Sequence, residues 1–275
     1  MTNYIIRRLL QVIPVMLAVS VIVFALLQIA PGDPASTLAG VDATQEDIEN
    51  IEAKFGLDKP LYVQYGIWLG RVLQGDLGRS IVTRRPVMEE IVSRIPLTAE
   101  LAFAAMFVAT LVGLLIGIIS AVRQYSFLDH LTMILSLLGV STPIFWLGLM
   151  LIFFFSVRLR WFPTGGAGSL EALVLPAVAL GAASAAIIAR MPRSSLLEVI
   201  RQDYMRTAQA KGLNERTVLL RHALKNALIP IITVIGLRFG YLLGGAVVTE
   251  TVFTRPGLGR LLVDGIKARD FPVVQ

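Results

Sequence analysis

Long apolar stretches without charge alternate with polar segments along the whole chain. Five of these stretches are residues 9–30, 101–122, 131–157, 172–189 and 227–249, and only the last contains a charge, Arg238. An α-helix rises about 1.5 Å per residue, so roughly 20 apolar residues cross a hydrocarbon core of about 30 Å. The pattern predicts an all-α, polytopic bundle of transmembrane helices with five visible spans.

The first apolar stretch is predicted to be a retained transmembrane helix, residues 1–30. Arg7 and Arg8 provide a positive start like that of a signal peptide. However, the apolar run is longer than the 7–15 residues of a signal-peptide core. The residues that follow, Ala30 to Asp33, also contain no clear A-x-A cleavage site.

Composition supports a membrane protein and excludes several kinds of site. Of 275 residues, 55% are hydrophobic and 16% are charged, whereas soluble domains carry about 25% charged residues. The absence of cysteine excludes disulfides, thiolate metal sites and cysteine nucleophiles. The two histidines, His130 and His222, fall at predicted membrane borders. We therefore expect no metal site.

The distribution of charge predicts the orientation. Residues 190–226 carry eight basic against three acidic residues, while residues 31–98 carry seven basic against ten acidic ones. Because short loops rich in Lys and Arg stay in the cytoplasm, we expect a cytoplasmic N-terminus, an outer segment at 31–98 and an inner segment at 190–226. Arg158 and Arg160, in a short outer loop, run against this assignment.

The outer segment, residues 31–98, is predicted to contain two amphipathic helices. Ile48, Ile51 and Phe55 share one apolar face, and a second helix begins near Pro60. Two interpretations stay open: a cap packed on the membrane or on neighbouring helices, and a docking surface for a soluble partner.

Small residues recur at four-residue spacing within the predicted spans. They are Gly113 and Gly117, Gly181 and Ala185, and Gly236, Gly240 and Gly244. This spacing lets helix backbones approach closely in lipid, where packing drives association. We expect these positions to serve helix packing.

The basic segment at 190–226 is predicted to fold as a rigid elbow. Its apolar residues follow a helical period up to Ala208, after which Gly212 can take the left-handed conformation that ends a helix. Leu213 can pack back on that helix and Asn214 can cap the next one. Such an elbow suits the transmission of force from a soluble partner. The alternative is a basic loop that only fixes orientation.

Missing motifs restrict the chemistry. The chain contains no G-x-x-x-x-G-K-[ST] phosphate loop, H-E-x-x-H or G-x-S-x-G motif, so we expect no catalytic residues. An ion-coupled secondary transporter is the alternative class, but such proteins show paired repeats and buried acids. The five apolar stretches contain no carboxylate and no symmetric halves.

Residues 206–230 resemble the EAA loop of ABC importer permeases. The family pattern begins Glu-Ala-Ala, whereas this chain has Arg206-Thr207-Ala208, a departure that resembles the dipeptide and oligopeptide subfamily. Other similar motifs are PGDP (31–34), GDLGRS (75–80), RRPV (84–87), PIFW (143–146), RPGLGRL (255–261) and RDFPVVQ (269–275). The resemblance covers essentially the whole chain.

This resemblance implies a function and a set of site residues. The chain would be a bacterial inner membrane permease that translocates peptides, with a permease core at 99–275 and a sixth span beyond Gln275, where the chain stops. The implied ATPase-coupling loop comprises Tyr204, Arg206, Thr207, Ala208, Lys211, Gly212, Leu213, Asn214, Arg216, Arg221, His222, Asn226 and Pro230.

The resemblance also implies partners. They would be a second homologous permease subunit, two cytoplasmic ABC ATPases and an extracytoplasmic binding protein. ATP and Mg would bind on the ATPases and no cofactor on this chain.

Within the span at 227–249, Arg238 and Tyr241 are candidates for the translocation path. An arginine at the centre of a span costs about 2.5–3.5 kcal/mol on translocon scales. Two interpretations stay open: a residue lining the path, and an arginine that snorkels or pairs with a partner helix.

Overall fold

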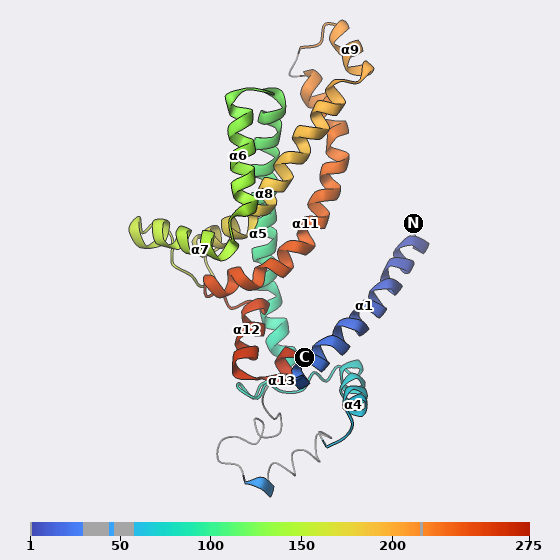
Figure 1. Ribbon diagram of the computed structural model, residues 1–275, viewed down its shortest axis with the longest axis vertical. Coiled ribbons are helices and arrows are strands. Elements are labelled where there is room, and N and C mark those ends of the chain that lie inside the picture. The colour runs from blue at the N-terminus through green and yellow to red at the C-terminus, as the bar shows by residue number, and fades with distance from the viewer. Residues whose placement is uncertain (1, 30–43, 47–57, 215–216) are drawn as a thin grey trace. The chain divides into compact units, whose positions relative to one another are not determined.

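A computed structural model describes residues 2–29, 44–46, 58–214 and 217–275. The named elements are α1 (Thr2–Ile29), α4 (Leu61–Leu73), α5 (Val87–Val122), α6 (Phe127–Ser141), α7 (Ile144–Leu151), η1 (Ile152–Arg158), α8 (Leu170–Ile200), α9 (Asp203–Ala210), η2 (Val218–Ala223), α11 (Leu224–Val252), α12 (Leu258–Ala268) and α13 (Phe271–Val274), where η denotes a π-helix (Figure 1).

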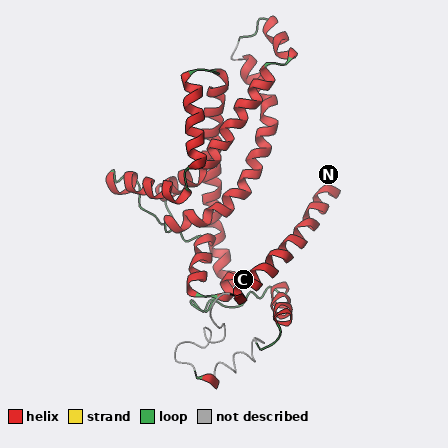
Figure 2. Ribbon diagram, in the orientation of Figure 1, coloured by secondary structure: helices red, strands yellow, loops and turns green. Residues whose placement is uncertain are grey.

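The all-α prediction is confirmed. In the described residues the structure contains helices, loops and one isolated antiparallel bridge between Arg79 and Pro86 (Figure 2). Within the described part of the chain, four helices are long and apolar enough to cross a membrane, at Asn3–Leu27, Val87–Val122, Leu170–Ile200 and Arg221–Val252. The pair formed by α6 and α7–η1 is a fifth candidate.

The predicted span at 131–157 is not one straight helix, which corrects the sequence interpretation. α6 and the α7–η1 segment are bent by 105° at the intervening break. Figure 1 shows α7 leaving the direction of α6 sideways. The cause lies at Pro143, because a proline disfavours helical dihedrals in the residue before it. Thr142 is accordingly extended, with φ −78° and ψ 122°.

The chain divides into two compact units, Met1–Ser93 with Leu261–Gln275, and Arg94–Arg260. This division differs from the segments predicted at 1–30, 31–98 and 99–275, because the C-terminal residues group with the N-terminal ones. Each unit is described by itself below.

The core of the second unit is built from small side chains of α5, α8 and α11. Ala105, Ala109, Leu180 and Ala246 are buried in one cluster. Gly181 of α8 lies against α5 so closely that a β-carbon there would approach the carbonyl oxygen of Ala105 to 2.7 Å. Alanine and glycine thus allow the helix backbones to come close, as packing in lipid requires.

In the first unit, aromatic side chains join α1 to α4. Phe24 of α1 contacts Tyr65 edge-on at 5.5 Å between ring centroids, and Trp68 at 6.2 Å. The hydroxyl groups of Ser20 and Tyr65 are 2.8 Å apart. α4 corresponds to the second predicted outer helix, while most of the first, near Ile48, lies outside the described residues. Both interpretations of the outer segment stay predictions.

Candidate functional site

The elbow, residues 203–230, packs on the bundle through two buried apolar side chains of α9, Met205 and Ala208, which are called its foot below. Met205 and Ala208 of α9 are 1% and 7% exposed. They pack in one cluster with Ala121 of α5, Leu196 of α8 and Ala227 of α11. The α9 helix is therefore packed against three long helices.

The predicted turn after α9 is present. Gly212 has a φ of +76°, which is the left-handed region that favours glycine. The Oδ1 atom of Asn214 accepts a hydrogen bond from the amide of Thr217 at 2.8 Å, so Asn214 caps the next helix as expected. Leu213, in contrast, is 39% exposed and does not pack back into the core.

A side-chain hydrogen bond closes the elbow. The Nδ2 atom of Asn226 donates to the hydroxyl of Tyr204 at 2.9 Å and to the carbonyl of His222 at 3.2 Å. Tyr204 lies on α9, His222 on η2 and Asn226 on α11. Pro230 lies inside α11, on its exposed side. The structure thus brings together predicted residues that are 22 positions apart.

The outer face of the elbow is polar and mostly basic. Arg206, Lys211 and Arg221 are exposed, as are Thr207 and Asn214. Arg206 has one acidic neighbour, Asp203, at 3.8 Å, and both side chains are largely exposed. An exposed pair of this kind contributes little to stability. Arg216, the remaining predicted member, lies outside the described residues.

The two candidates for the translocation path contact each other. The Arg238 guanidinium lies 5.5 Å from the centre of the Tyr241 ring, a cation–π arrangement on α11. Tyr241 is 57% exposed. Tyr241 lies on a side of α11 that the other helices of its unit leave uncovered, whereas Arg238 is only partly exposed. Gly236, Gly240 and Gly244 form an open stripe on α11, because a β-carbon at each would meet no atom within 4 Å. With 3.6 residues per turn, this stripe lies on the opposite side of α11 from Arg238.

Sequence reasoning missed a buried ion pair at the α5–α6 end of the bundle. Asp129 is 3% exposed and accepts hydrogen bonds from Arg193 of α8, at 2.7 Å from Nε and 2.8 Å from Nη2. Ser120 and the amide of Tyr125 also donate to it. The signal was present in the Ser126-x-x-Asp129 pattern before an apolar run, which is typical of a helix start.

A second buried carboxylate organises the end of α11. Glu250 is fully buried and accepts hydrogen bonds from the Thr98 hydroxyl at 2.6 Å and the Arg260 amide at 3.1 Å. The expectation that the spans contain no carboxylate is therefore wrong for the helices as folded. α6 and α11 extend past the apolar stretches and include Asp129 and Glu250.

Family models match both parts of the chain. The model of the binding-protein-dependent transport system inner membrane component matches residues 113–275. The model of the N-terminal region of such membrane components matches residues 1–102.

Curated relatives match over the full length of the chain. The glutathione transport system permease protein GsiC of Escherichia coli O6:H1 is 49% identical over 275 residues, which is all of this chain and 90% of that protein. GsiC of Salmonella typhimurium is 50% identical over the same shares.

Two solved structures share the fold. One is an inward-facing MetNI methionine ABC transporter, with a TM-score of 0.54 and 21% identity, covering 68% of this chain and 88% of that chain. The other is an amino acid ABC transporter with histidines, with a TM-score of 0.53 and 17% identity, covering 68% of this chain and 83% of that chain. At these identities the likeness concerns the fold alone.

Proposed function

Because the chain belongs to the family of inner membrane components of binding-protein-dependent transport systems, we propose that it carries small peptides, glutathione first among them, into the cell. As a member of that family it is a multi-pass inner membrane permease of an ABC importer and not itself an enzyme. Importers of this class work with ATPase and substrate-binding partners. Membership favours ATP-driven transport over the ion-coupled alternative.

The substrate proposal rests on one observation above all. Relatives at 49–50% identity over the whole chain are glutathione permeases by name. The chemistry of α11 is compatible with this cargo. Glutathione has two carboxylates, and a guanidinium such as that of Arg238 pairs well with a carboxylate. Tyr241 is exposed, and the partly exposed Arg238 lies over its ring, so the two side chains would line the path together.

The proposed assembly contains a second homologous permease, two cytoplasmic ATPases that bind ATP and Mg, and an extracytoplasmic binding protein. The open glycine face of α11 would adjoin the second permease. We also expect the N-terminus and the elbow to lie on the cytoplasmic side.

The proposed coupling element is the elbow. Its basic outer face would contact an ATPase, and its buried foot would carry the movement to α5, α8 and α11. The positive φ of Gly212 and the cap at Asn214 give the outer face a fixed shape. A loop that served only as an orientation marker would need neither feature.

Uptake by the reconstituted transporter tests the function. Proteoliposomes that contain all proposed subunits, with ATP enclosed, are expected to accumulate labelled glutathione and to continue when an uncoupler is added. A catalytic variant of the ATPase is expected to abolish uptake. Uptake that ceases with the uncoupler would contradict ATP-driven import. Transport of unrelated dipeptides with no transport of glutathione would contradict the substrate assignment alone.

Gly212→Val tests the coupling element. A β-carbon in the left-handed region costs about 1–2 kcal/mol, so the turn should rearrange and ATPase co-purification and substrate-stimulated ATP hydrolysis should fall. Gly212→Ala should do less harm. Gly75→Val is the matched control, because Gly75 has a φ of +83°, has no neighbour within 4 Å and lies outside the elbow. Wild-type values for Gly212→Val would leave the elbow as an orientation signal only.

A further inference from the structure

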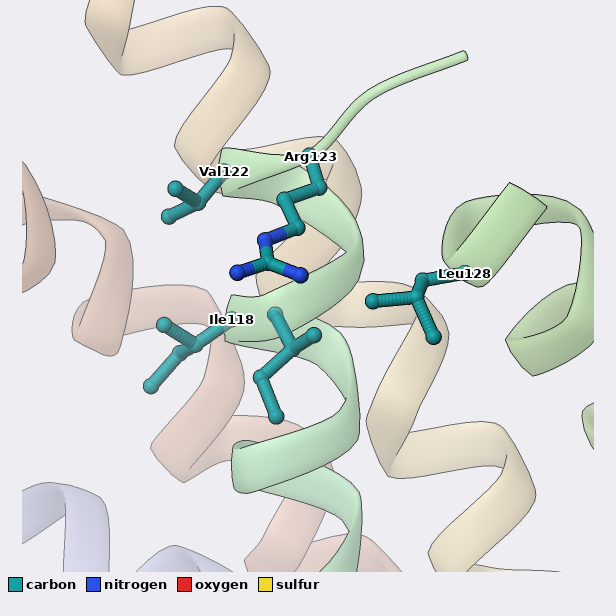
Figure 3. A pocket seen from close by; sticks show the side chains of 5 residues that line it. Ile118, Val122, Arg123 and Leu128 are labelled. Carbon is teal, nitrogen blue, oxygen red and sulfur yellow. The ribbon is translucent and has the colours of Figure 1, made fainter. Parts of the chain in front are cut away.

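A groove of about 340 Å³ lies where α5 ends and α6 begins. Its walls are Ile118, Ile119, Val122, Arg123 and Leu128. Figure 3 shows the Arg123 side chain extending along the groove, with its guanidinium between Val122 and Leu128. The groove therefore combines an apolar wall with one cationic group.

The charge of Arg123 is not balanced within the described chain. In the residues that the structure describes, no hydrogen bond, ion pair or ring contact involves its side chain. The carboxylate on the neighbouring helix, Asp129, is already bound by Arg193 through two nitrogen atoms. A guanidinium against an apolar wall favours an anionic partner from outside the chain.

The position of the groove indicates the depth at which that partner lies. α5 is a candidate membrane-spanning helix and α6 is one half of the bent fifth candidate, and the groove lies where α5 ends and α6 begins. The turn between them presents Tyr125 and Phe127, which are 76% and 78% exposed. Exposed aromatic residues at a span end are typical of the membrane–water interface. At that level a phospholipid offers a phosphate next to acyl chains.

We propose that this groove binds an anionic phospholipid, with the phosphate on Arg123 and an acyl chain along Ile118, Ile119 and Leu128. A soluble anion would leave the apolar wall uncovered, and a neutral lipid would leave the net positive charge unbalanced. Basic pockets at the ends of membrane helices bind anionic headgroups by the same physics.

The bound lipid would also touch the foot of the elbow. Ile118 lines the groove and packs against the cluster that contains Met205 and Ala208 of α9. Ile118 of α5 therefore contacts both the groove and the elbow, and a lipid bound in the groove would hold Ile118 in place. This inference concerns lipid recognition and does not depend on the identity of the transported substrate.

Native mass spectrometry of the purified full chain tests the proposal. The chain is mixed with equal amounts of phosphatidylglycerol and phosphatidylcholine, and the ratio of the two bound lipids is measured. One cation near a headgroup contributes about a fivefold preference, so Arg123→Gln should lower the phosphatidylglycerol ratio about fivefold. Arg158→Gln is the matched control. It removes the same charge from another span end, where Arg158 lies over Phe153, and it should leave the ratio unchanged.

Two further measurements separate the groove from general electrostatics and from a soluble anion. Leu128→Trp fills the groove and keeps Arg123, and should also reduce retention of phosphatidylglycerol. Size-exclusion profiles of all variants should match that of wild type. The proposal is overturned by an unchanged ratio in Arg123→Gln, by an equal loss in Arg158→Gln, by full retention in Leu128→Trp, or by displacement of phosphatidylglycerol with excess inorganic phosphate.

Discussion

Two glycine stripes with the same four-residue spacing have opposite surroundings in this molecule. On α5, Gly113 and Gly117 face α8 so closely that added β-carbons would collide with Ile188 and with the carbonyl of Ala189. On α11, Gly236, Gly240 and Gly244 meet no atom within 4 Å. The first stripe completes the fold of this chain, and the second is left open by it.

The difference teaches that spacing predicts close approach but not the partner. In a bilayer, an apolar helix face is no more stable against another helix than against lipid tails, so helices associate through close packing. Small residues therefore mark the positions where another backbone can approach. The α5 stripe finds its partner within the chain. We infer that the α11 stripe faces the second permease, since it is uncovered and its small residues permit close approach of another backbone. The following predictions test this division between closed and open faces.

The largest effect on thermal stability is expected for a substitution that breaks the buried ion pair between Arg193 and Asp129. Arg193→Met leaves the Asp129 carboxylate, with a side chain 4% exposed, without its counterion. Breaking a buried pair from one side costs about 3–5 kcal/mol, so the thermal midpoint and the yield of monodisperse protein should drop sharply.

Arg238→Met is the matched control, because it removes a partly exposed arginine whose side chain contacts an exposed tyrosine and no carboxylate. Its thermal midpoint should stay near that of wild type. Equal losses in the two variants would contradict the special cost assigned to breaking the buried pair of Arg193 and Asp129.

A smaller loss is expected for Gly117→Val. The added side chain would meet the backbone of α8 and Pro192, and overpacking of this kind costs about 1–3 kcal/mol. The thermal midpoint of the isolated chain should fall. A midpoint within error of wild type would show that α5 and α8 separate at little cost.

Gly240→Val should reverse that pattern. The isolated chain should keep its midpoint, since the added side chain has open space. Recovery of the second permease in a pull-down should decrease, because close approach of the backbones would be blocked. Normal co-purification would exclude this face from the proposed subunit interface.

Sequence patterns predicted much of the fold because membrane helices are determined by local composition. The apolar stretches located α1, α5, α8 and α11, and Gly212 and Asn214 predicted the turn after α9. The bend at Pro143 was missed because the apolar run continues through it. A proline disfavours helical dihedrals in the residue before it, and at Pro143 that residue, Thr142, is extended, so the helix ends there.

The buried carboxylates could not be predicted because their partners are distant in sequence. Arg193 contacts Asp129 across 64 positions, and Glu250 receives its hydrogen bond from Thr98 across 152 positions. A charged residue next to an apolar run is compatible with solvent exposure or burial, and tertiary contacts decide between the two. Whether a face of α11 is covered likewise depends on which helices pack against it, and the sequence of α11 alone does not determine this.

The smallest effect is expected for Arg238→Gln, measured in the reconstituted transporter. Arg238 is half-buried and stacks on an exposed ring, so a passing carboxylate would meet it while still partly hydrated. An exposed ion pair contributes at most about 1 kcal/mol, which corresponds to a change of up to about fivefold in the uptake rate. The substitution removes the charge but keeps a polar, hydrogen-bonding side chain, so assembly with the second permease should be normal. Tyr241→Phe keeps the ring face under the guanidinium and serves as the control, with uptake close to wild type. If Arg238→Gln assembles normally and transports glutathione and neutral peptide analogues at wild-type rates, the arginine has a structural role only.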